Sequence, residues 1–123
     1  MVHLAAVRRG APNTFIIADL PAGSYDVESD ALKNAQRLID AGADAVKPEG
    51  SPHIIKAITE SSIDVMGHLG YLPQTAEQFK IVGRAQQEAA ALKQDADAIE
   101  AAGAFSLVLE CVPAPLATEL SQQ

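Results

Sequence analysis

The sequence has little of what secreted, membrane-spanning or nucleic-acid-binding proteins usually need. It contains one cysteine, Cys111, so no internal disulfide can form, and this favours the cytoplasm. No apolar run approaches the roughly 18 residues of a membrane span, and residues 1–7 are too short and too interrupted for a signal peptide. Nine Lys and Arg face sixteen Asp and Glu. We therefore expect a cytoplasmic protein that binds neither membrane nor the phosphate backbone of nucleic acid.

The sequence does contain enough apolar material for one folded domain. Its 123 residues are 48% hydrophobic, which is too apolar for an intrinsically disordered chain. A chain of this length buries roughly two-thirds of its unfolded surface. We predict a single domain over residues 1–123. The one basic pair, Arg8 and Arg9, stands before Gly10 and is interpreted as the solvated end of a short helix.

Short apolar runs alternate with helical patterns along the chain. The apolar runs are residues 14–18, 43–46, 63–66 and 105–109. The helical patterns are residues 4–9, 31–39, 88–102 and 116–120, with a shorter one after Pro52 and a loop over residues 67–82. This alternation predicts an α/β fold of parallel (β/α) units with right-handed crossovers. The pattern leaves open whether the sheet is doubly wound or closed into a barrel.

Each apolar run is followed by a titratable side chain. These side chains are Asp19, Glu49, His68 and Glu110. Because the carboxyl ends of parallel strands meet on one face of a sheet, we expect all four on that face, at neighbouring strands. Polar residues also end strands for solvation alone, so each residue has a structural alternative.

Asp19 and Glu49 carry the hard oxygen ligands that Mg²⁺ prefers. Alternatively, Asp19 caps the turn before Pro21 and Glu49 lies in a solvated loop. Lys47 precedes Glu49 by two residues and therefore points to the same side of its strand. There it could attract an anionic substrate, or it could be a surface lysine at the rim.

His68 and Glu110 are the candidates for proton transfer and hydrogen bonding. His68 could donate a hydrogen bond or a proton, and the alternative is a ring satisfied by backbone groups. Glu110 stands among the apolar residues 107–109 and 111–112. Burial in that setting would suit it to act as a general base. The alternative is a carboxylate paired with a neighbouring helix.

Six stretches of the sequence resemble ketopantoate hydroxymethyltransferase in order and spacing. They are residues 5–12 (AAVRRGAP), 18–21 (ADLP), 46–50 (VKPEG), 67–74 (with GHLG and PQ), 82–84 (VGR) and 107–113 (LVLECVP). The resemblance implies a (β/α)₈ barrel. A whole barrel takes roughly 250 residues, so this chain would hold about half of one.

The resemblance also implies roles for the candidate residues. Asp19 corresponds to a magnesium ligand, and Glu49 belongs to the metal site directly or through water. Lys47 and His68 correspond to residues that contact the keto acid, and Glu110 to the base. The implied reaction transfers a hydroxymethyl group from 5,10-methylenetetrahydrofolate to 3-methyl-2-oxobutanoate, giving 2-dehydropantoate. Mg²⁺ is the implied cofactor, and a homo-oligomer is the implied assembly.

The sequence departs from the family in three places. It has no Gly-Asp-Ser segment, whose aspartate is the family's other main metal ligand, and no Gly-rich segment of the last strands. The loop at residues 73–84 is shorter and lacks a Gly-Gly pair before Val82. We therefore expect an internal segment of the barrel that is weakly active or inactive in isolation. Two alternatives are a non-catalytic remnant or interaction module of the family, and a relative in the phosphoenolpyruvate mutase and isocitrate lyase group.

Overall fold

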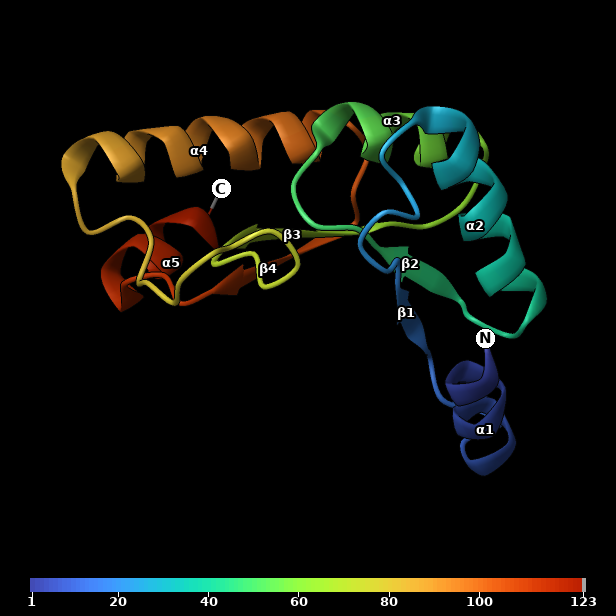
Figure 1. The fold of residues 1–123 in the computed structure, drawn as a ribbon. Coiled ribbons are helices and arrows are strands. Elements are labelled where there is room, and N and C mark those ends of the chain that lie inside the picture. The colour runs from blue at the N-terminus through green and yellow to red at the C-terminus, as the bar shows by residue number, and fades with distance from the viewer. Residues whose placement is uncertain (123) are drawn as a thin grey trace.

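A computed structural model describes residues 1–122, in which helices and strands alternate (Figure 1). Gln123, the last residue of the predicted domain, lies outside the described residues. The elements in chain order are α1 (Val2–Gly10), β1 (Ile17–Asp19), α2 (Glu28–Asp40), β2 (Ala45–Lys47), α3 (Pro52–Glu60), β3 (Met66–Gly70), α4 (Gln86–Ala101), β4 (Ser106–Glu110) and α5 (Ala114–Leu120). Within residues 1–122, none of the helices has the length and apolar character needed to cross a membrane.

The strands pair side by side and run parallel. β1 pairs with β2, where Asp19 stands opposite Lys47, and β3 pairs with β4 along its whole length. A parallel bridge between Val46 and Val65 joins the two pairs, so the spatial order is β1, β2, β3, β4. The predicted fold of parallel (β/α) units is confirmed.

The sheet is strongly curved. Phe15 precedes β1 and Phe105 precedes β4, yet their rings meet edge to face with centroids 6.1 Å apart. In a flat sheet the outer strands of a set of four would lie about 14 Å apart, at roughly 4.8 Å per strand. The two rings bridge the amino ends of β1 and β4, which agrees with the curved sheet of a barrel.

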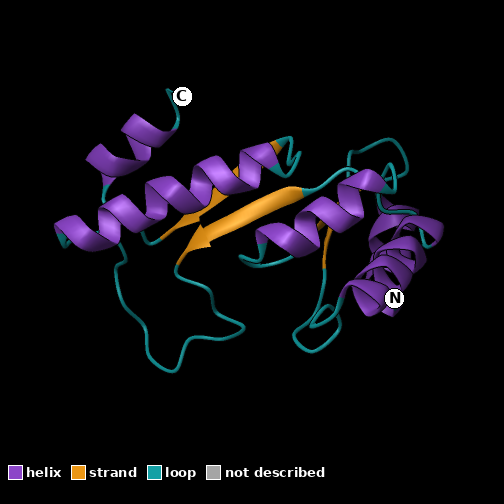
Figure 2. Cartoon of the chain, turned by 90° about the horizontal axis from the view of Figure 1, so that it is seen from above, coloured by secondary structure: helices purple, strands orange, loops and turns teal. Residues whose placement is uncertain are grey.

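Three helices cover one side of the strands and supply the core (Figures 1 and 2). Each buries one stripe of apolar residues, mostly at i, i+4 and i+7. The stripes are Ala31, Ala35 and Leu38 on α2, Ile54, Ile55 and Ile58 on α3, and Leu92, Ala96 and Ile99 on α4. A large aliphatic side chain contributes about 1.5–3 kcal/mol when fully buried. The stripes predicted on residues 31–39 and 88–102 are thus confirmed as the packing faces.

The strands begin later in the sequence than the apolar runs predict. β1 starts at Ile17 instead of residue 14, and β3 covers Met66–Gly70, most of which was expected to belong to a loop. The residues that enter the strands, such as Ala43 and Ile63, are buried without forming ladders. Residues at buried positions are apolar whether or not they belong to a strand. An apolar composition alone therefore does not distinguish a segment that leads into a strand from the paired strand itself.

Arg8 anchors α1, contrary to the interpretation of Arg8 and Arg9 as a solvated pair. Its Nε donates to the carbonyl oxygen of Gly42 at 2.7 Å, and its NH1 donates to that of Thr14 at 2.8 Å. Its NH2 pairs with Asp44. The five donors of a guanidinium allow one side chain to hold several groups, and so the residue is partly buried. Arg9 is exposed, as expected.

Asp44 completes this anchor at the start of β2. Its carboxylate accepts the Ile16 N–H at 2.8 Å as well as the Arg8 guanidinium. The hydrogen bond from the Ile16 N–H is the largest cause that lowers the pKa of Asp44 below its ordinary value, and the hydrogen bond from Arg8 is the second. The carboxylate is therefore ionised at neutral pH, and it ties α1, β1 and β2 together.

We expect Arg8→Leu to lower the free energy of unfolding by about 2–3 kcal/mol, because the carbonyl oxygens of Gly42 and Thr14 lose a charged donor. The matched control Arg9→Leu should change it by less than about 0.5 kcal/mol. Urea unfolding followed by circular dichroism measures both changes. Equal losses in the two variants would contradict the anchoring role of Arg8.

Candidate active site

The five predicted site residues form one connected set of polar contacts at the carboxyl ends of the strands. Lys47 Nζ lies 3.0 Å from Asp19 Oδ1 and 3.4 Å from His68 Nδ1. His68 Nε2 lies 3.1 Å from Glu110 Oε2, and His68 Nδ1 lies 3.9 Å from Glu49 Oε1. The expected convergence of residues from neighbouring strands on one face is confirmed. Their chemical roles stay predictions.

Lys47 links β1 to β3 across the end of β2. Its side chain is 16% exposed, so the alternative of a surface lysine at the rim is wrong. The parallel register sets Lys47 opposite Asp19, which is 63% exposed and pairs with it. An ammonium group has three N–H donors, and two of them are directed at Asp19 and His68. The third is available to an anionic ligand.

His68 is buried, and its ring nitrogens lie near the side chains of Glu49 and Glu110. The alternative of a ring satisfied by backbone groups is therefore wrong. The Lys47 ammonium cannot accept a hydrogen bond, so His68 Nδ1 must be the acceptor. In the neutral ring Nε2 then carries the proton. Nε2 is close to Glu110, but no aligned hydrogen-bond partner is found for it within residues 1–122. Nε2 is thus a buried polar atom whose hydrogen-bonding capacity is unused within the described residues.

Glu49 is buried, with 6% exposure, so the alternative of a solvated loop residue is wrong. Its Oε2 accepts the backbone N–H of Gln74 at 3.0 Å, and its own N–H donates to the Tyr25 hydroxyl at 3.3 Å. A buried carboxylate is costly unless it is hydrogen-bonded, and these contacts offset that cost. Glu49 is thus held at both its main chain and its side chain.

Tyr25 and Gln74 were missed as site residues by the sequence analysis. Gln74 fell within a matched stretch without a role, and Tyr25 had no signal except its place in the loop after β1. Burial raises the pKa of Tyr25, and the charges of Glu49, Asp26 and Asp19 add to the shift. The neutral hydroxyl donates to Gln74 Oε1 at 2.9 Å.

Glu110 owes its position to a close approach between β3 and β4. The Tyr71 N–H donates to the Glu110 carbonyl at 2.7 Å. A Cβ on Gly70 would stand 2.1 Å from that same oxygen, and Gly70 has φ +91°, so only glycine fits. The next residue, Cys111, has φ 52° and turns the chain sharply away from the strand.

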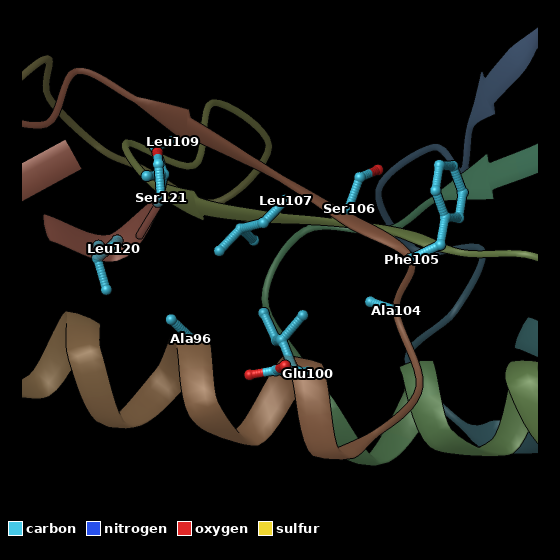
Figure 3. Close-up of a pocket in the computed structure, with 10 residues that line it drawn as sticks. Ala96, Glu100, Ala104, Phe105, Ser106, Leu107, Leu109, Leu120 and Ser121 are labelled. Carbon is cyan, nitrogen blue, oxygen red and sulfur yellow. The ribbon is translucent and has the colours of Figure 1, made fainter. Parts of the chain in front are cut away.

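The predicted burial of Glu110 among apolar neighbours is wrong, since its side chain is 39% exposed. Side chains alternate between the two faces of a strand. Leu107 and Leu109 face the helical layer, where they line a cavity of about 370 Å³ between α4, β4 and α5 (Figure 3). Glu110 points to the opposite side, toward His68. The alternative pairing with a helix is also wrong, because the partner of Glu110 lies in β3.

A second cavity, different from the one in Figure 3, has Glu49 alone of the five site residues in its lining. It measures about 280 Å³ and lies at the rim formed by the loops after β1, β2 and β3. Glu49, Tyr25 and Gln74 line it together with Asp26, Ser51 and His53. The larger apolar cavity has none of the five site residues in its lining.

Asp19 and Glu49 suit a divalent cation unequally. Asp19 is exposed and uses Oδ1 for Lys47, which leaves Oδ2 to face solvent. Glu49 uses Oε2 for Gln74, so Oε1 is the oxygen it can offer, directly or through water. Across residues 1–122, no group of three or more His, Cys, Asp or Glu side chains is arranged as a metal centre. Mg²⁺ is usually held by one or two carboxylates with waters and substrate oxygens, and these two carboxylates are of the type that could supply such ligands.

Comparisons with known sequences point to one family. The family described as ketopantoate hydroxymethyltransferase matches residues 1–123. A 3-methyl-2-oxobutanoate hydroxymethyltransferase of Heliobacterium modesticaldum is 47% identical over 127 residues, covering 97% of this chain and 46% of that protein. The enzyme of the same name from Desulfotalea psychrophila is 49% identical over 123 residues, covering 94% and 44%. The chain spans about half the length of the curated relatives it matches.

A comparison with solved structures identifies the fold. Phosphonopyruvate hydrolase superposes with a TM-score of 0.62 over 89% of this chain and 41% of that chain. At 18% identity this likeness shows the fold alone. The fold is about half of a (β/α)₈ barrel, as predicted, and this decides the choice that the sequence pattern left open.

We expect neutral His68 to carry its proton on Nε2. The Lys47 ammonium occupies the side of Nδ1, and a donor there would face another donor. Long-range ¹H–¹⁵N spectra of the ring nitrogens report the tautomer, with the exposed His3 and His53 as internal controls. A proton found on Nδ1 would contradict the arrangement of Lys47 and His68.

Proposed function

This chain belongs to the ketopantoate hydroxymethyltransferase family, and we propose that it contributes an active site to hydroxymethyl transfer in pantothenate biosynthesis. The substrates would be 3-methyl-2-oxobutanoate and 5,10-methylenetetrahydrofolate, and the product 2-dehydropantoate. One water is consumed, and it supplies the oxygen of the new hydroxymethyl group. A cytoplasmic location and a homo-oligomeric assembly belong to the same proposal.

One observation carries the proposal. The residues that the resemblance assigns to metal, keto acid and base come from β1, β2, β3 and β4, yet they touch in one chain of contacts from Asp19 through Lys47 and His68 to Glu110. Side chains placed only for packing would have no reason to form such a set.

Lys47 and His68 would bind and orient the keto acid. The free N–H of the Lys47 ammonium would pair with the substrate carboxylate, and the pairing with Asp19 keeps that ammonium in place beforehand. The Nε2–H of His68 would donate to a substrate oxygen, since it has no aligned acceptor within the described residues. Both groups are mostly buried, so water competes little for these bonds.

Glu110 would accept the proton from C3 of the keto acid. Its carboxylate is partly exposed on the face of the strands opposite the helices, and one of its oxygens lies 3.1 Å from His68 Nε2. The electron pair of the broken C–H bond would move into the enolate. Water would add to the methylene carbon of the cosubstrate and both C–N bonds of that carbon would break, which leaves tetrahydrofolate and a one-carbon unit at the oxidation level of formaldehyde. The enolate carbon would attack that unit, and the carboxyl proton of Glu110 would pass to the new alkoxide oxygen.

Asp19 and Glu49 would hold the metal. The chemistry supplied by bound Mg²⁺ is polarisation of the keto and carboxylate oxygens, which makes C3 more acidic. Asp19 would supply a direct oxygen, and Glu49 a direct or water-bridged one. No described residue is assigned to the folate.

We expect Glu110→Gln, made in a complete family barrel that contains this segment, to abolish exchange of the C3 proton and leave keto-acid binding largely intact. An amide of the same shape keeps the packing but cannot accept the proton, so the loss falls on the chemical step. Deuterium exchange followed by NMR without folate isolates that step. Glu100→Gln, an exposed change on α4, is the matched control. Exchange at the parent rate would make Glu110 a structural carboxylate, with His68 the next candidate for the base.

We also expect Mg²⁺ to bind the 123-residue chain weakly in the absence of keto acid. Asp19 offers one exposed carboxylate, while Glu49 has one oxygen committed to Gln74. Calorimetric titration measures the affinity, and Asp19→Asn should lower it further. A submicromolar dissociation constant would be incompatible with a site built on these two carboxylates.

A further inference from the structure

We propose that Tyr25 and Gln74 are positioning residues that fix Asp19 and Glu49 relative to one another, an inference that rests on the proposed function. With Leu20 and Glu49 they form a closed set of hydrogen bonds, here called the rim clasp. The rim clasp joins the loops that follow β1, β2 and β3. It touches no reacting atom, so its role is to place the groups that do.

The rim clasp is continuous. The Tyr25 hydroxyl donates to Gln74 Oε1 at 2.9 Å and accepts the Glu49 N–H at 3.3 Å. The Gln74 backbone N–H donates to Glu49 Oε2 at 3.0 Å. Gln74 Nε2 donates to the Leu20 carbonyl at 2.9 Å. The Tyr25 hydroxyl, the Gln74 side-chain amide and the Gln74 main-chain N–H thus each have a defined hydrogen-bond partner.

The clasp extends to Asp19 through Leu20, its neighbour in the chain. Leu20 is fully buried, and its N–H donates to the Lys47 carbonyl at 3.1 Å. The side-chain amide of Gln74 therefore binds the main chain directly after Asp19. The backbone N–H of Gln74 binds the Glu49 carboxylate. The side chain of Asp19 is 63% exposed and, among the described residues, pairs with Lys47 alone, and a contact of this kind contributes little to fixing its position.

Burial makes the bonds of the clasp interdependent. Tyr25 is 8% exposed and Glu49 is 6% exposed. When one partner is removed, the other is left unsatisfied, which costs more than the bond itself contributes. Outer groups that orient a metal ligand commonly change metal affinity by 10- to 100-fold when they are mutated.

The test uses Tyr25→Phe in the 123-residue chain, which removes the hydroxyl and keeps the ring. Tyr71→Phe is the matched control, because it makes the same change in the other of the two tyrosines. Amide hydrogen exchange by NMR is the first readout. Tyr25→Phe should speed exchange at the Glu49 and Gln74 amides by about tenfold, the loss of roughly one hydrogen bond. Amides within α3 should match those of the control.

Titration with MgCl₂, followed through the amide shifts of Asp19 and Glu49, is the second readout. Tyr25→Phe should weaken Mg²⁺ binding by about tenfold relative to Tyr71→Phe. Gln74→Leu, which keeps the backbone N–H, should have a similar effect. The double variant should be little worse than either single one, because both belong to one set of bonds.

The outcomes separate this inference from the proposed function. If the parent chain binds no Mg²⁺, the proposed metal site fails, and the positioning role toward it falls with it. If the parent binds Mg²⁺ and Tyr25→Phe binds it as tightly as the control does, the positioning role is wrong while the metal site stands. Faster exchange spread evenly over α3 and the rim would show that Tyr25 supports the fold in general, and would also overturn the inference.

Discussion

The parallel register of β1 to β4 is the constraint on which the site depends. It sets Asp19 opposite Lys47 and Gly70 opposite Glu110, and it brings His68 of β3 within reach of the groups on both sides. A slip of one residue in any pair would turn the site side chains to the helical face, since side chains alternate along a strand. The register is fixed from the other face, where the strands pack against α2, α3 and α4. The hydrophobic core thus determines the geometry of the polar residues without touching them.

Burial of charge is the second theme of the structure. Glu49 and His68 are the buried polar or charged residues found within residues 1–122, and both lie in the site. Each is held by neighbours, Glu49 by Gln74 and Tyr25, and His68 by Lys47 and Glu110. Buried groups of this kind add little to stability by themselves, but they are strongly destabilising when a partner is lost. Such an arrangement is typical of a site in which position matters more than stability.

The curvature of the sheet relates this half to a whole barrel. Contact between Phe15 and Phe105 brings the amino ends of the outer strands together, while the site residues gather at the carboxyl ends. The backbone edges of β1 and β4 each pair on one side within the described residues. Relatives that align with this chain are about twice as long. In a (β/α)₈ barrel the face of the strands opposite the helices is the interior, and Lys47, His68 and Glu110 lie on that face.

The sequence by itself determined the alternation of helices and strands and the buried stripes of α2 and α4, because local periodicity depends on neighbouring residues alone. It also indicated that the five titratable side chains at the strand ends would meet on one face, while their roles stay predictions. It could not decide the strand limits, the exposure of Glu110 or the burial of Glu49, since these depend on which face a strand presents and on what covers it. It also gave no reason to single out Tyr25, or to separate Arg8 from Arg9. Their hydrogen-bond partners lie 24 to 49 residues away for Tyr25 and up to 36 for Arg8. Contacts at such separations arise when the chain folds, and only the tertiary structure decides them.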